Sequence, residues 1–250
     1  MNRINKSCIY FTLIILLSSC NTYKELNTAL ANPAKVKKLN LSNSGIRELP
    51  PEIGNLTNLQ TLNLFRNKLE TLPPEIGKLK HLEKFVLSSN KLKTLPPEIG
   101  DIEKLKELSL QNNELISLPN EIGKLNKLEF LKLTYNNLNS LPPGIGGLTN
   151  LQFLYIEHNN ISLLPREIGN LERLKFFHIG KNQLESLPLE IGNLTSLIEF
   201  NVSTSGVLLK VPDSICNLRK LELFYIDPNT LVPYCLQTRL SQRFKILISQ

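Results

Sequence analysis

The residues that could support catalysis in this 250-residue chain are spread along a repeat and are not gathered into a site. Glycines 144, 146 and 147 could suggest a phosphate-binding loop, but the sequence around them does not provide the strand and helix that such a loop requires. Glu157, His158 and His178 are potential metal ligands, but two histidines and a carboxylate on an open sheet are more often surface or interface groups. We therefore expect no catalytic residue, no metal, no cofactor and no enzyme activity. One glutamate per repeat fits the solvated start of a short helix better than a carboxylate pair: Glu52, Glu75, Glu98, Glu121, Glu167 and Glu190.

The first twenty residues have the features of an export signal. A basic start precedes an apolar run from Cys8 to Leu17, which is too short to span a bilayer comfortably. The ending Leu17-Ser18-Ser19-Cys20 resembles the lipobox of bacterial lipoproteins, which implies removal of residues 1–19 and acylation of the Cys20 thiol. An ordinary secretory signal with a chance cysteine is the alternative. Because Asn21 replaces the aspartate of the inner-membrane retention signal, we expect a lipid anchor at the outer membrane or cell surface.

Cys216 and Cys235 would be the only thiols left after this processing. An oxidising compartment and their position near the end of the chain favour a disulfide in a C-terminal cap. Two buried free thiols are the alternative, since the sequence does not give the geometry that a disulfide needs.

One 23-residue pattern must position all these residues, and Leu59 to His81 shows it as LQTLNLFRNKLETLPPEIGKLKH. Leu62 to Leu64 alternates in the manner of a strand, with the leucines on one side. Asn67 can bond backbone groups of its own turn and of the next coil. Pro73 to Gly77 stops the strand and forms a short helical turn that the glycine allows to end. One coil cannot cover its own leucines, so successive coils must stack over a continuous core.

This pattern resembles the leucine-rich repeat family, and with the segment before it the chain resembles leucine-rich repeat lipoproteins of spirochaete-like bacteria. The resemblance implies an α/β solenoid, a horseshoe with a concave parallel β-sheet and short helical or 3-10 turns on the convex side. Apolar residues at helical spacing in 20–35, the lipidated N-terminus, predict a capping helix. Residues 36–235 would form about nine coils, and residues 236–250 a C-terminal cap or tail.

The tail has two readings. Its apolar residues recur near helical spacing, with arginines and a lysine between them. They could cover the end of the core, or they could form a basic amphipathic helix on a membrane or partner. The apolar residues are Leu236, Leu240, Phe244 and Leu247.

Binding residues are expected at the outward strand positions, which the scaffold leaves free to vary. Phe130, Phe153 and Phe176 occupy the same outward position in three successive copies, and we call them the phenylalanine ladder. Tyr155 and His178 flank it, and Tyr135 lies at its edge. A contiguous exposed apolar patch indicates an interaction site, and aromatic residues carry interface hot spots. The rings could instead only stack along the sheet, or the tail could fold back over them.

These observations predict a non-catalytic protein-binding module anchored to the bacterial envelope, with a protein partner on the concave face and no nucleic acid. The resemblance implies a partner among host surface or matrix molecules. The formal charge of +7 falls to +5 when Arg3 and Lys6 leave with the signal, and this excess leaves room for an alternative, a glycosaminoglycan-like polyanion bound by basic residues. A structural envelope protein is a further alternative. The basic residues are Arg66, Lys84, Lys132, Lys181 and those of the tail.

Overall fold

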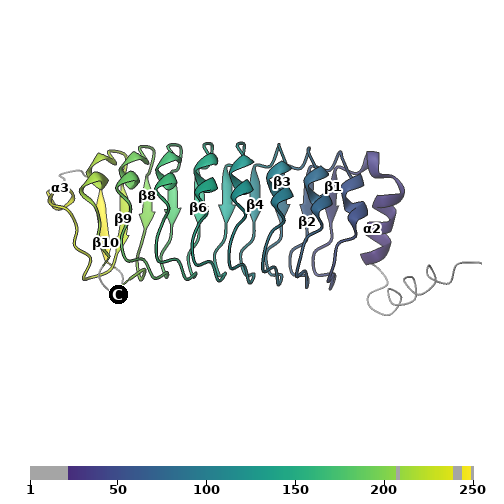
Figure 1. Ribbon diagram of the computed structural model, residues 1–250, viewed down its shortest axis with the longest axis horizontal. Coiled ribbons are helices and arrows are strands. Elements are labelled where there is room, and N and C mark those ends of the chain that lie inside the picture. Colours follow the sequence, from purple (N-terminus) through teal and green to yellow (C-terminus); the bar gives the residue numbers. More distant parts are fainter. Residues whose placement is uncertain (1–21, 207–208, 239–243, 249–250) are drawn as a thin grey trace, which may run out of the picture.

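The chain folds into a single row of stacked coils (Figure 1). The computed structural model describes residues 22–206, 209–238 and 244–248, so the signal segment 1–19 and Cys20 lie outside the described residues. Each coil contributes one strand to a single parallel sheet, and the strands follow one another in chain order. The strands are β1 Lys38–Asn40, β2 Thr61–Asn63, β3 Lys84–Val86, β4 Glu107–Ser109, β5 Phe130–Lys132, β6 Phe153–Tyr155, β7 Phe176–His178, β8 Glu199–Asn201, β9 Leu223–Ile226 and β10 Lys245–Ile248.

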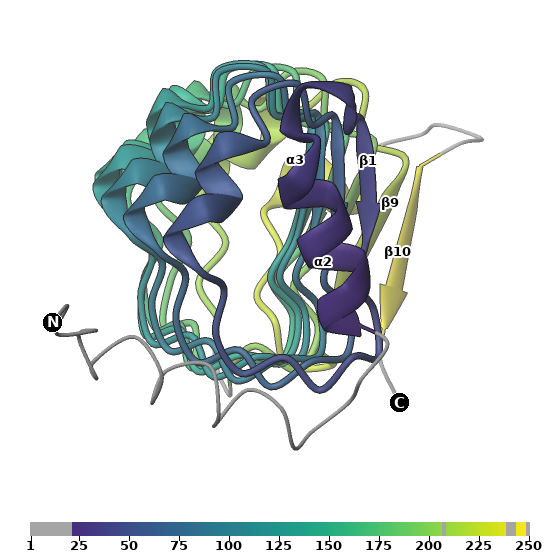
Figure 2. The same ribbon diagram turned by 90° about the vertical axis from the view of Figure 1, so that its right-hand side faces the viewer.

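Short 3-10 helices lie on the side of each coil opposite the sheet, as Figure 2 shows along the axis of the row. The predicted solenoid is therefore confirmed. The sheet runs along the row without curling (Figure 1) and has ten strands, where about nine were expected. The 3-10 helices are η2 Pro33–Lys35, η3 Pro51–Asn55, η4 Pro74–Lys78, η5 Pro97–Asp101, η6 Asn120–Lys124, η7 Pro143–Gly147, η8 Arg166–Asn170, η9 Leu189–Asn193 and η10 Asp213–Asn217.

The repeat leucines form one continuous core between the sheet and the 3-10 helices. In the second coil, Leu62, Leu64, Leu69 and Ile76 have no exposed surface. Each such side chain contributes roughly 1.5–3 kcal/mol when it is removed from water. Because adjacent coils supply the cover, this burial exists only in the stack.

Buried asparagines hold neighbouring coils together. The Asn67 side-chain oxygen accepts bonds from the backbone N–H groups of Ser44 and Ile46, both at 3.0 Å. Its amide donates to the carbonyls of Leu41 at 2.8 Å and Leu64 at 2.9 Å. One side chain thus satisfies backbone groups of two coils that would otherwise be buried without partners. Equivalent asparagines bridge later coils: Asn90, Asn113, Asn136, Asn159 and Asn182.

The repeat glycine is needed for the close approach of coils. A Cβ atom on Gly100 would lie 2.2 Å from the carbonyl oxygen of Glu121 in the next coil. Since real Cβ atoms do not come so near a backbone oxygen, any side chain there would push the coils apart. We had expected this glycine to let the helical turn end. The structure shows that it lets the neighbouring coil come close.

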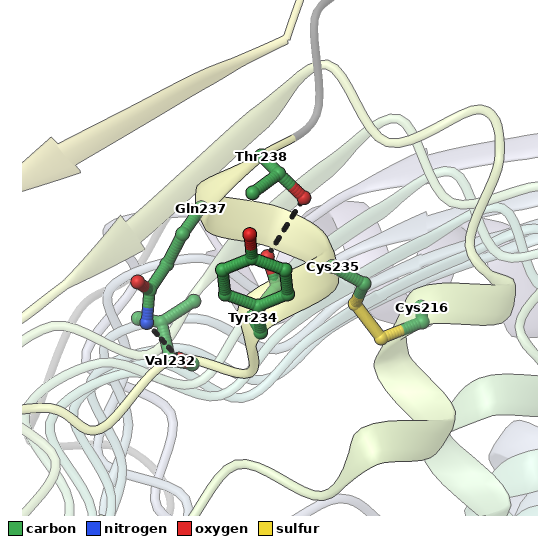
Figure 3. The surroundings of a disulfide bond; sticks show 6 residues. All are labelled: Cys216, Val232, Tyr234, Cys235, Gln237 and Thr238. Atoms are coloured by element: carbon green, nitrogen blue, oxygen red, sulfur yellow. Dashed lines mark hydrogen bonds between the residues drawn. A yellow bond between two sulfur atoms is a disulfide. The ribbon is translucent and has the colours of Figure 1, made fainter.

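Cys216 takes the glycine position in the eighth coil, where no further 3-10 helix follows among the described residues. The helix α3, Tyr234–Gln237, contacts η10 instead and leaves room for a side chain. There Cys216 forms a disulfide with Cys235, with 6.0 Å between the two Cα atoms (Figure 3). The bond ties α3 to the last full coil, and Leu236 of α3 is buried against the core.

The helix α2, Thr22–Ala31, covers the other end of the row, where a capping helix was expected (Figure 1). Its Leu26 and Ala29 side chains are buried and belong to the core. No helix among the described residues has the length and apolar character needed to cross a membrane.

The end of the tail does not form the helix that the spacing of its apolar residues suggested. Lys245–Ile248 is the strand β10, which pairs in parallel with β9 so that Leu247 lies beside Tyr225. The backbone groups at the outer edge of β9 need partners, and the β-branched Ile246 and Ile248 favour an extended chain. This segment is therefore not an amphipathic helix. Leu240 lies outside the described residues.

We predict that Asn136→Ala lowers the free energy of unfolding by about 2–4 kcal/mol. The change leaves the Leu115 N–H, which donates to Asn136 at 3.0 Å, buried without a partner. It also removes one bond from each of the carbonyls of Leu110 and Leu133. Urea unfolding measures the loss. Asn137→Ala is the matched control, because this neighbouring side chain is exposed. Equal stability of the two variants would contradict the role given to the buried asparagines.

Candidate functional site

The outward side chains of the ten strands form two parallel columns on the solvent side of the sheet, which we call the strand face. Neighbouring strands pair in register, so residues 23 apart in sequence lie side by side from β1 to β8. The first column contains Lys38, Thr61, Lys84, Glu107, Phe130, Phe153, Phe176, Glu199, Leu223 and Lys245. The second contains Asn40, Asn63, Val86, Ser109, Lys132, Tyr155, His178, Asn201, Tyr225 and Leu247.

The phenylalanine ladder is continuous in the first column. The ring centroids of Phe130 and Phe153 lie 5.1 Å apart, and those of Phe153 and Phe176 lie 5.0 Å apart in nearly parallel planes. Each ring partly covers the next, so all three are half-buried. Stacking along the sheet, which the sequence left open, is therefore present. This stacking leaves the outer edges of the three rings accessible on the strand face.

The core does not require these rings. Phe176 points outward, whereas the adjacent Phe177 points inward and stacks on Phe200, with 5.2 Å between ring centroids. Aromatic packing inside the solenoid is thus supplied by a separate set of phenylalanines. The described parts of the tail, 236–238 and 244–248, do not cover the ladder. The first contains the end of α3, which contacts η10, and the second forms β10, which pairs with β9 at the end of the sheet.

Tyr155 and Lys132 extend the ladder into the second column. The Tyr155 ring lies 5.6 Å from that of Phe130, and the two are tilted by 49°. The Lys132 ammonium lies 5.0 Å from the centre of the Phe130 ring and 5.8 Å from that of Tyr155. Both distances fall within the range of cation–π attraction. The strand face therefore holds an apolar patch with one cation already on its rings.

A histidine between two carboxylates lies in the same second column, beside the Phe176 end of the ladder. His178 Nε2 lies 2.9 Å from Glu199 Oε1, and His178 Nδ1 lies 3.8 Å from Glu157 Oε1. The Nε2 atom is buried without a hydrogen bond of good geometry, despite the short distance. No group of histidine, cysteine or carboxylate side chains in the described ranges is arranged to hold a metal ion.

The two carboxylates also act on Tyr155. Burial raises the pKa of the Tyr155 phenol above its usual value, and the negative charges of Glu199 and then Glu157 raise it further. The His178 ring meets the Tyr155 ring edge-on, at 4.9 Å between centroids. The negative field of both glutamates is therefore directed at the flank of the ladder.

Tyr135 forms a second aromatic contact at the edge of the sheet. Its ring stacks on that of His158, with 4.0 Å between centroids, and about half of Tyr135 is exposed. Burial lowers the pKa of His158, as does Lys181, while Glu157 opposes the shift. Both stacked residues have left-handed backbone angles, with φ of 59° and 54°. Bulky side chains are uncommon in that conformation, which recurs just before the asparagine position in every coil from the first to the eighth.

The cations expected to bind a polyanion are not gathered on one surface. Lys84 forms an ion pair with Glu107, and Lys132 lies over the aromatic rings. Arg66 and Lys181 occupy the left-handed edge position of the second and seventh coils, far apart in the row. Two arginines of the tail, Arg239 and Arg243, lie outside the described residues.

The chain matches the family described as a leucine-rich repeat region over residues 6–117 and 98–175. No curated protein matches it significantly. It is similar to the structure of a leucine-rich repeat protein of Leptospira interrogans, with 28% identity and a TM-score of 0.63 over 91% of this chain and 81% of that one. The leucine-rich repeat domain of the type III effector XopL has 25% identity and a TM-score of 0.77 over the same shares. The plant peptide hormone receptor RGFR1, solved in complex with RGF2, has 26% identity and a TM-score of 0.70. That similarity covers 84% of this chain and 35% of the receptor.

We predict that Glu199→Gln lowers the pKa of the Tyr155 phenol, because it removes a negative charge that disfavours the phenolate. NMR of carbon-labelled tyrosine rings, with Tyr155→Phe to assign the signal, follows the titration. Glu107→Gln is the control, since Glu107 occupies the same column beyond the other end of the ladder. An unchanged Tyr155 titration in Glu199→Gln would contradict the geometry of this flank.

Proposed function

Because the chain belongs to the leucine-rich repeat family, whose fold commonly serves as a protein-binding module, we propose that it is a non-catalytic protein that binds a protein partner on its strand face. The observation that carries this proposal is the phenylalanine ladder with Tyr155. These rings sit outside the core, on a scaffold whose copies from β1 to β4 carry charged, polar or small residues at the same positions, such as Thr61 and Asn63. A patch of aromatic residues with a polar rim has the composition of an interface hot spot.

The structural relatives support a binding role for the fold. RGFR1 is a receptor solved with its ligand RGF2, and the similarity covers most of the coils of this chain. The Leptospira protein supports the bacterial resemblance drawn from the repeat pattern. On this basis the proposed partner is a protein outside the cytoplasm, including host surface or matrix molecules.

We further propose that Cys20 carries a lipid that anchors the protein to the bacterial envelope, at the outer membrane or cell surface. The support is the sequence Leu17-Ser18-Ser19-Cys20 after a short apolar run. Several acyl chains on one cysteine would hold the protein stably where a single chain would not. The anchor would leave the row of coils and its strand face outside the membrane.

Polyanion binding is the weaker candidate, because Lys84 and Lys132 already interact with Glu107 and with aromatic rings. Ionic strength distinguishes the two functions. Binding to a polyanion weakens steeply as salt rises, whereas binding centred on aromatic residues changes little.

We predict that Phe153→Ala combined with Tyr155→Ala weakens partner binding by at least about 2 kcal/mol, or about thirtyfold, because hot-spot rings are lost. Both side chains face outward, so circular dichroism should show an intact fold. Thirty-fold weaker binding would be measured by surface plasmon resonance with a partner captured from an unbiased pull-down.

The matched control is Thr61→Ala with Asn63→Ala, which changes the same two columns in β2. The control should bind as the unaltered protein does. A partner that binds both variants equally would place the site elsewhere.

We predict that labelled fatty acid is incorporated into the protein in a bacterial host and that Cys20→Ser abolishes the label. Membrane fractionation should show the altered protein leaving the envelope fraction. Label that persists in Cys20→Ser, or no label in the unaltered protein, would contradict the acylation of Cys20.

A further inference from the structure

The two ends of the phenylalanine ladder differ in charge. In the first column, Glu107 of β4 pairs in register with Phe130, and Glu199 of β8 pairs in register with Phe176. The first column therefore has a glutamate directly beyond each end of the ladder. Glu107 is neutralised by the Lys84 ammonium of the neighbouring strand β3. Glu199 has no such lysine.

The carboxylates at the β8 end share one weak base. Glu199 and Glu157 both approach His178, at 2.9 and 3.8 Å, and within the described ranges neither forms an ion pair with a lysine or arginine. Their side chains are only 20% and 27% exposed. Because His178 supplies at most one positive charge, this flank keeps a net negative charge in either protonation state. Partly buried carboxylates are normally paired with enough positive charge to balance them, so this flank lacks a cation.

Aromatic rings adjoin this negative flank. Tyr155 touches His178 edge-on at 4.9 Å, and Phe176 adjoins Glu199 through the strand register. Lys132 shows that these rings accept a cation, but its ammonium lies toward Phe130, at the opposite end. A second cation, at the β7–β8 end, would meet both rings and carboxylates.

We propose that the partner presents an apolar segment to the phenylalanine ladder and, next to it, a lysine or arginine side chain to Glu157 and Glu199. The inference rests on the proposed function and specifies the chemistry of the partner. Charge complementarity selects this occupant, because an acidic segment would meet the net negative charge of Glu157 and Glu199.

The dimensions fit a short stretch of extended chain. From Phe130 to Phe176 the ladder spans about 10 Å, and an extended peptide advances about 3.3 Å per residue. Roughly three residues therefore cross the ladder before the basic residue reaches the carboxylates.

Display of random-sequence peptides on phage tests the inference with the full-length protein as bait. Recovered peptides should combine apolar residues with a lysine or arginine at one end of the apolar stretch. The bait with Phe153→Ala and Tyr155→Ala measures the background. If no peptide is enriched above that background, protein binding at the ladder is contradicted. If peptides are enriched without a basic residue, the proposed function stands and this inference is overturned.

Synthetic versions of an enriched peptide then test the contact itself. Replacing its arginine by citrulline, or its lysine by norleucine, should weaken binding about tenfold or more. On the bait with Glu157→Gln and Glu199→Gln the same replacement should have no effect, because the charges it complements are gone. Glu107→Gln is the matched control and should retain the full difference. A neutral peptide that binds the unaltered protein as tightly as the basic one would overturn the inference.

Discussion

The distance between neighbouring strands is the constraint on which the rest of this structure depends. Strands of a sheet lie about 4.8 Å apart, and the buried asparagines hold successive coils at that distance by bonding backbone groups of both. Asn67 alone accepts two such bonds and donates two. The same closeness explains why Gly100 carries no side chain beside Glu121. A scaffold this regular converts one residue position per coil into one column of side chains.

The phenylalanine ladder follows directly from that spacing. Ring centroids 5.0 and 5.1 Å apart are what outward phenylalanines on adjacent strands must adopt, and this separation suits stacked rings. Charges are subject to the same rule. Lys84 meets Glu107 and Glu83 meets Lys106, each pair 23 residues apart, because a residue faces its equivalent in the next coil. Glu199 has no lysine in the next coil, where Leu223 stands, and it faces the weak base His178 instead.

The sequence was most informative where the repeat applies, although it did not reveal that the repeat glycine lets the neighbouring coil come close. The 23-residue period predicted the solenoid and the outward columns that contain Phe153 and Tyr155. The helical spacing of apolar residues before the first coil predicted a capping helix at the position of α2. The sequence did not predict β10, because residues 245–248 follow no repeat and the edge of β9, with which they pair, decides their conformation. Nor did it reveal the left-handed angle of Tyr135, which is a property of the turn and not of the residue. The contacts of His178 with both glutamates depend on side-chain directions that a column assignment does not contain.

The central claim is that the residues which depart from the repeat, on the strand face, form the binding site. Site-specific photo-crosslinking is its most direct test. A photoreactive phenylalanine derivative would replace Phe153 in one protein and Phe65 in another. Phe65 is the better-exposed ring, on a coil that keeps the plain repeat, so exposure alone would favour it. Our account predicts a covalent adduct with a partner protein from position 153 and none from position 65. An adduct from position 65, with none from position 153, would contradict it.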